Sequence, residues 1–119
     1  MNKLCAVLIA VFLIFALSAC SFEEETLITS QSSPNGNYTV CLYQVGSPQW
    51  SFGAVKAKLV LKDGNGTVLD EVNFSLANDG TGVYVDNIKQ ISWSENRVEI
   101  SMREFDTTRQ FAYVLSYTD

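Results

Sequence analysis

Residues 55–76 read VKAKLVLKDGNGTVLDEVNFSL, and this stretch decides the fold class. In its first part, apolar residues occupy every second position and lysines fill most of the positions between them. Such a period of two is typical of a strand with one face on a core and the other in water. The DGNG sequence at 63–66 predicts a tight hairpin, because Asn-Gly suits a type I′ turn. Residues 68–76 then alternate again, so the stretch predicts a β-hairpin.

The same alternation recurs in other parts of the chain, and no helical period of 3.6 follows Cys20. The further predicted strands cover residues 38–45, 88–93, 97–103 and 111–117. Residues 38–45 are apolar on both faces, which predicts a strand covered on both sides. The sequence thus predicts an all-β domain over 34–119. We expect a small antiparallel meander of about six strands that forms a sandwich or a partly open barrel.

The N-terminal residues predict export and lipidation. Lys3 is followed by an apolar run from Leu4 to Leu17, whose helix would span about 21 Å, less than the roughly 30 Å of a bilayer core. A basic start and a short apolar run are typical of a signal peptide. The sequence Leu17-Ser18-Ala19-Cys20 resembles the lipobox of bacterial lipoproteins.

This resemblance implies that residues 1–19 are a signal peptide and that Cys20 carries the acyl chains, palmitate among them. It places the protein on the extracytoplasmic side of the cell membrane, or on the outer membrane if the host is Gram-negative. Residues 20–33 hold three consecutive glutamates and then Thr, Ser and Gln. We interpret this segment as a lipidated Cys followed by a polar tether.

Charge excludes two classes of partner. The chain has 8 basic and 13 acidic residues and a net charge of −5. Removal of residues 1–19 takes away one basic residue, Lys3, and gives −6. Such a surface repels nucleic acid and anionic headgroups, so we expect no nucleic-acid partner and a membrane attachment made by the acyl chains.

The sequence predicts no enzyme and no cofactor. The chain has no histidine, and Cys41 lies in an apolar run where a lone cysteine usually packs as a small hydrophobe. The oxygen-rich stretches 63–66 and 78–80 do not match a calcium loop, and we interpret them as turns and predict no metal site. If a cation binds, the place expected for it is around Asn78, Asp79 and Asp86.

The meander predicts where binding residues lie. Long connections at 46–54, 77–87 and 104–109 should share one end, with the tight turns and the tether at the other. The long loops would then face away from the membrane. The candidate binding residues in these loops are Trp50, Phe52, Asn78, Asp79, Thr81, Tyr84 and Asp86. The aromatic residues Trp50, Phe52 and Tyr84 could anchor a protein, stack on a glycan or fold back over the core.

Two further resemblances concern the mature chain. Ser33-Pro34-Asn35-Gly36-Asn37-Tyr38, with the strands at 91–93 and 98–100, is similar to small lipoproteins of Gram-positive bacteria known only as domains of unknown function. The segment Thr81-Gly82-Val83-Tyr84 resembles the membrane-bound lysozyme inhibitors. The expected function is a non-enzymatic cell-envelope module that binds a protein or glycan through the distal loops. The alternative is an inhibitor of an extracytoplasmic hydrolase.

Overall fold

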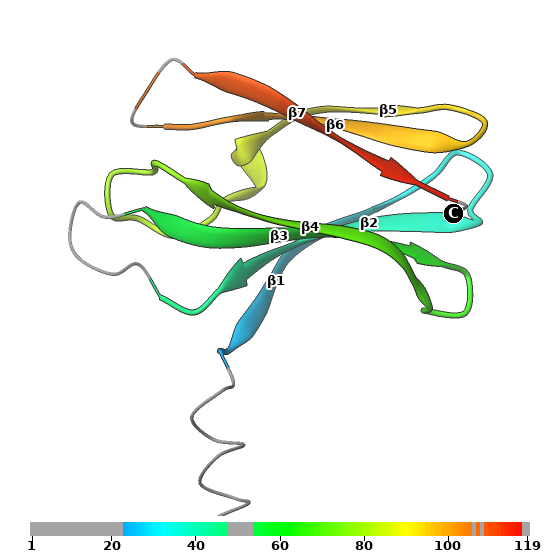
Figure 1. Cartoon of the computed structure of the whole chain (residues 1–119), viewed down its shortest axis with the longest axis horizontal. Coiled ribbons are helices and arrows are strands. Elements are labelled where there is room, and N and C mark those ends of the chain that lie inside the picture. Colours follow the sequence, from blue (N-terminus) through cyan, green and yellow to red (C-terminus); the bar gives the residue numbers. More distant parts are fainter. Residues whose placement is uncertain (1–22, 48–53, 106, 108, 118–119) are drawn as a thin grey trace, which may run out of the picture.

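The structure, a computed structural model, describes residues 23–47, 54–105, 107 and 109–117. The predicted signal peptide and the predicted roles of Cys20, Trp50 and Phe52 fall outside these residues. The elements, in chain order, are β1 (Glu25–Ser32), β2 (Tyr38–Val45), β3 (Val55–Asp63), β4 (Val68–Leu76), a 3₁₀ turn η1 (Val85–Asn87), β5 (Ile88–Trp93), β6 (Arg97–Arg103) and β7 (Gln110–Ser116) (Figure 1).

The all-β prediction is confirmed. Strands β1-β2-β3-β4 form one antiparallel sheet and β5-β6-β7 form a second, each in sequence order. The two sheets lie over one another as an open sandwich (Figure 1). All six strands expected from the sequence are present, and a seventh, β1, precedes them.

Strand β1 contradicts part of the predicted tether. Residues 20–33 were expected to be solvated, but residues 25–32 pair with β2, from Glu25 opposite Val45 to Ser32 opposite Thr39. A polar sequence is tolerated because β1 is an edge strand that pairs on one side only. The register shifts between Leu27 and Thr29, and Ile28 packs against the core. The tether prediction is therefore wrong for 25–32.

The hairpin at 63–67 forms, but its turn is not type I′. Among the residues described there, only Gly66 has a positive φ, at 83°, whereas a type I′ turn needs two such residues. The Gly66 amide donates to the Asp63 carbonyl, and the Asp63 amide to the Thr67 carbonyl. The Asp63 carboxylate also accepts hydrogen bonds from two backbone amides of the turn, which favours this longer connection over a two-residue loop.

The core lies between the sheets and follows the predicted alternation. Its fully buried residues come from both sheets and include Val40, Leu42, Val55, Leu59, Leu61, Leu76, Val98, Ile100, Met102 and Leu115. Burial of each such side chain contributes roughly 1.5–3 kcal/mol to folding. On the outer face of the first sheet, Cys41 and Val60 pair across β2 and β3 and are buried as well. The prediction of burial on both faces is therefore confirmed for the middle of β2, while Thr39 and Tyr43, on the same outer face as Cys41, are half-buried.

The position of residue 23 overturns the predicted orientation of the loops. We call the end formed by residues 46–47, 54, 77–87, 104–105, 107 and 109 the loop end, and the end formed by the turns 33–37, 64–67 and 94–96 the turn end. The connections are grouped as expected, but the Gly46 amide donates to the Glu24 carbonyl, so the chain enters β1 at the loop end (Figure 1). The additional strand β1 reverses the direction of the chain once more than the predicted six-strand meander does, which moves the start of the domain to the other end. The prediction that the loops lie opposite the N-terminal segment is wrong.

Candidate functional site

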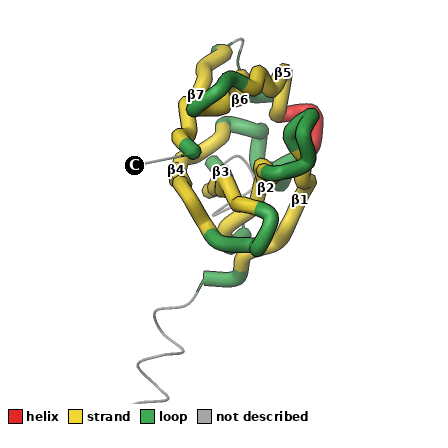
Figure 2. The backbone as a smooth tube through the Cα atoms, turned by 90° about the vertical axis from the view of Figure 1, so that its right-hand side faces the viewer, coloured by secondary structure: helices red, strands yellow, loops and turns green. Residues whose placement is uncertain are grey.

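The connection 77–87, which holds five of the seven candidate binding residues, crosses the end of the sandwich. It leaves β4, which borders β7, and reaches β5 on the other side of the second sheet (Figure 2). In crossing, it buries Asn78, Val83 and Asn87, which are at most 4% exposed. This connection therefore closes the core at the loop end.

Asn78 is a structural residue rather than a ligand. Its Nδ2 donates to Asn87 Oδ1 at 2.9 Å and to the Gly82 carbonyl at 3.0 Å. Its Oδ1 accepts from Asn87 Nδ2 at 3.0 Å and from the Phe105 amide at 3.3 Å. Because these four contacts use the whole amide, Asn78 has no free oxygen for a cation. Asn87, which the sequence analysis missed, completes the pair by donating to the Arg103 carbonyl at 2.9 Å.

The other polar candidates have separate surroundings. The Thr81 hydroxyl donates to the Asn78 carbonyl within its own loop. Asp79 is exposed and has a φ of 56°, a left-handed conformation that Asp tolerates in turns. Asp86 is exposed, and its carbonyl accepts from Arg103 Nε at 2.7 Å. Among the described residues, no group of three or more Cys, Asp or Glu side chains is placed to hold a metal ion.

Tyr84 belongs to an exposed apolar surface. Its ring lies 5.6 Å from that of Phe105, centroid to centroid, and Val85 is exposed next to it. These three residues and Asp86 line a shallow hollow of about 400 Å³, which we call the Tyr84 surface. Phe105 was not among the predicted site residues, although its place in a loop beside Glu104 could have suggested exposure. The structure therefore keeps Tyr84 as a candidate and adds Val85 and Phe105.

A buried carboxylate supports this end of the molecule. Glu104 Oε1 accepts from Arg109 Nε at 2.8 Å and Thr107 Oγ1 at 3.0 Å, and Oε2 accepts from Arg109 and the Ala77 amide. Burial by itself raises the pKa of Glu104, but the hydrogen bonds from Arg109, Ala77 and Thr107 outweigh it and hold the pKa below its usual value. Glu104 is thus a charged cross-link between the two loops.

A second hollow lies at the turn end, between the sheets. Its floor is aromatic: Tyr38 stacks on Tyr117 with centroids 4.2 Å apart, and Trp93 lies 6.3 Å from Tyr117. Its rim is polar, and its volume is about 320 Å³. The residues that line it are Ser33, Pro34, Asn35, Asn37, Tyr38, Trp93, Ser94, Glu95 and Tyr117. We call it the turn-end groove. Tyr38 and Trp93 are both half-buried.

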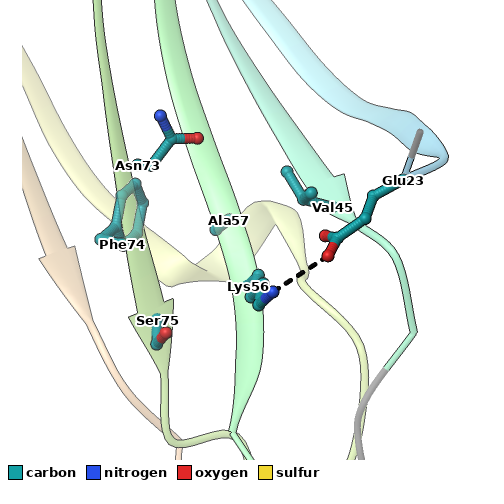
Figure 3. Close-up of a pocket in the computed structure, with 7 residues that line it drawn as sticks. All are labelled: Glu23, Val45, Lys56, Ala57, Asn73, Phe74 and Ser75. Atoms are coloured by element: carbon teal, nitrogen blue, oxygen red, sulfur yellow. Dashed lines mark hydrogen bonds and ion pairs between the residues drawn. The ribbon is translucent and has the colours of Figure 1, made fainter. Parts of the chain in front are cut away.

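A third hollow, of about 390 Å³, lies where the chain enters the domain. In Figure 3, Lys56 Nζ reaches the Glu23 carboxylate, 3.1 Å away, while Phe74 and Asn73 line the opposite side. Both charged side chains are about half exposed, so the pair adds little stability. It does hold the start of the described chain against β3 at the loop end.

Comparisons with known proteins give no relative. No protein-family model matches the chain, and no curated protein and no solved structure matches it. None of the helical residues that the structure describes forms a segment long and apolar enough to cross a membrane.

Proposed function

We propose that this protein is a lipid-anchored, extracytoplasmic binding module without catalytic activity, held by Cys20 at its loop end and offering the turn-end groove to an envelope glycan. The observation that carries the proposal is the position of Glu23. It follows the lipobox Cys20 with only Ser21 and Phe22 between them, and it lies at the loop end. The turn end is then the surface directed away from the anchor.

The composition of the turn-end groove favours a glycan over a protein segment. Aromatic ring faces stack on the C–H faces of sugar rings, and hydroxyl, amide and carboxylate groups bond to sugar hydroxyls. Tyr38, Trp93 and Tyr117 supply the rings, while Asn37 and Glu95 stand at the exposed rim. The volume is at the lower end of the usual range for ligand sites, roughly 300–1,000 Å³, and suits a short saccharide.

The absence of catalysis is proposed on the chemistry of the chain. It has no histidine, and Cys41 is buried. The Glu104 carboxylate accepts four hydrogen bonds from its own chain, which leaves it poorly placed to act as an acid or base.

Inhibition of a hydrolase is the second candidate, and the exposed ring of Tyr84 is the observation that favours it. The Thr81 hydroxyl, however, is engaged within its own loop. In the proposed arrangement this loop lies at the anchored end, where a soluble hydrolase would have poor access.

The test is capture of full-length lipidated protein in detergent on an array of cell-envelope glycan fragments. Glu95→Ala and Asn37→Ala remove exposed rim groups, so each should weaken binding about fivefold or more without lowering Tm, as for loss of one hydrogen bond. Asn65→Ala, an exposed change at the same end outside the groove, is the matched control and should bind normally.

Binding that persists in both rim variants would overturn the groove as the site. Absence of glycan binding, with a single protein captured instead, would replace the glycan by a protein partner. Loss of hydrolase activity on adding the protein, reversed by Tyr84→Ala, would establish the inhibitor.

A further inference from the structure

The Tyr84 surface has the properties of a membrane contact. Tyr84 and Val85 are each 49% exposed and Phe105 is 44% exposed, although all three are large apolar residues. The two rings lie side by side, 5.6 Å apart, and so form one continuous patch. Exposed aromatic residues grouped in this way usually mark a surface that is covered in the working protein.

A relay of contacts connects this patch to the segment through which the chain enters the domain. The Val83 amide, directly before Tyr84, donates to Gln44 Oε1 at 2.9 Å. Gln44 pairs with Thr26 of β1, and the amide of Gly46, two residues later, donates to the Glu24 carbonyl. A continuous series of contacts therefore joins the Tyr84 surface to the first described residues of the chain.

The length of chain before Glu23 decides what covers the patch. Three residue steps from Cys20 to Glu23 span at most about 10 Å when fully extended. An acyl group on Cys20 would thus keep Glu23, at the loop end, within that distance of the bilayer surface. From these positions we infer that Tyr84, Val85 and Phe105 rest in the headgroup region of the membrane that holds the acyl chains. The inference depends on the proposed lipid anchor.

A lipid surface fits this patch better than a protein does. Three side chains are few for a stable protein interface, which needs roughly 800 Å² on each partner, whereas an acyl-anchored domain needs only an orienting contact. Tyr rings are favoured at the boundary between headgroups and hydrocarbon, and Phe side chains are typical of apolar faces that lie in this boundary. One acidic residue, Asp86, lines the hollow, and one basic residue, Arg103, donates to the Asp86 carbonyl, so the patch carries no net charge that would attract anionic lipid. The contact is therefore apolar, and it orients the domain rather than anchoring it.

The test measures the depth of a nitroxide label on the full-length lipidated protein in phosphatidylcholine vesicles. The label is placed at Val85→Cys in a Cys41→Ala background, because Cys20 has no free thiol once acylated. Asn65→Cys at the turn end is the matched control. The Val85 label should be severalfold less accessible to a water-soluble nickel complex, and more accessible to oxygen, than the Asn65 label.

A second variant removes the effect of the label itself. Tyr84→Ser with Phe105→Ser changes two exposed residues and should leave Tm nearly unchanged, while the Val85 label becomes severalfold more accessible to nickel. Equal nickel access at positions 85 and 65, in protein shown by mass to be acylated, would overturn the inference and leave the lipid anchor standing. Protein that is not acylated and does not sediment with vesicles would overturn both the anchor and the inference.

Discussion

Glu104 has a carboxylate side chain that is only 4% exposed, yet it remains charged through Arg109, Thr107 and the Ala77 amide. Its folded-state pKa is lower than its ordinary value of 4.5. In the window between these two values the unfolded chain binds the proton more readily than the folded chain. The stabilisation from Glu104 is therefore fully present above pH 4.5 and is lost as the pH falls through the folded-state pKa.

Substitution Glu104→Gln should remove this pH dependence. The neutral amide loses the charge-assisted bonds and points N–H groups at donors, so the free energy of unfolding at pH 7 should fall by about 1.5–3 kcal/mol. The difference from the natural protein should shrink as the pH is lowered below 4.5. Urea unfolding of both detergent-solubilised proteins, from neutral to acidic pH, measures this difference in the free energy of unfolding. Glu99→Gln, an exposed change on β6, is the control, and an equal pH dependence in the Glu104→Gln protein would contradict the expectation.

At the residue scale, the sequence pointed to the connection 77–87 but did not show which of its residues are structural and which are exposed for binding. Tyr84 is exposed as a binding residue should be. From the sequence, Asn78 was a possible cation ligand. Its actual partner, Asn87, is nine positions later, and their pairing depends on how the connection crosses the sandwich, which the sequence does not show. Phe105 meets Tyr84 only because two connections converge at one end. Such contacts are set by tertiary packing, which a local pattern does not reveal.

At the element scale, β1 is the strand that the sequence did not reveal. Glu25 to Ser32 has a polar majority and no clean alternation, because an edge strand with most of its length exposed needs little apolar surface. Its pairing comes from the free edge of β2, which an inspection of residues 25–32 alone cannot show. The other six strands were predictable because burial between two sheets imposes alternating apolar side chains on them.

Adjacent substitutions in β1 distinguish a strand from a tether. Ile28 is half-buried against the core and Leu27 is 53% exposed. Ile28→Ala should lower the free energy of unfolding by about 1–2 kcal/mol, less than for a fully buried site. Leu27→Ala should change it by less than about 0.5 kcal/mol. Urea unfolding measures both, and equal, near-zero effects would mean that residues 25–32 do not pack on the domain in solution.

At the scale of the whole molecule, the net charge does not contribute to membrane attachment. Three of the basic side chains, Lys56, Lys58 and Arg109, already pair with glutamates of the same chain. The chain without residues 1–19 has an excess of six negative charges. This net negative charge does not attract the protein to an anionic bilayer.

A protein that begins at Ser21, and so lacks both the apolar run 4–17 and the acylation site Cys20, should therefore be absent from the membrane fraction and should sediment no better with vesicles that contain phosphatidylglycerol than with phosphatidylcholine alone. Repulsion of the acidic surface by anionic lipid is the reason. Vesicle sedimentation at low salt checks this, with the acylated protein as the positive control. Stronger binding to the anionic vesicles would show that charge contributes to attachment.

The placement of the two ends was also only partly predictable. Counting strands grouped the long connections correctly, but one unrecognised strand moved the start of the domain from the turn end to the loop end. In a meander each strand reverses the direction of the chain, so the end at which the first strand starts depends on whether the number of strands is odd or even. Missing one strand therefore reverses the predicted orientation but leaves the predicted fold class correct.

The connection 77–87 is the sole covalent link between the two sheets, and no strand pairing joins them in the described residues. The sheets meet through side chains such as Phe74 with Phe111 and Tyr113. If the connection opened, two copies could exchange their three-stranded sheets and make the same contacts between molecules, which is domain swapping. The Asn78–Asn87 pair holds the connection folded back. These two amides thus favour the closed arrangement of one chain over an exchanged arrangement of two.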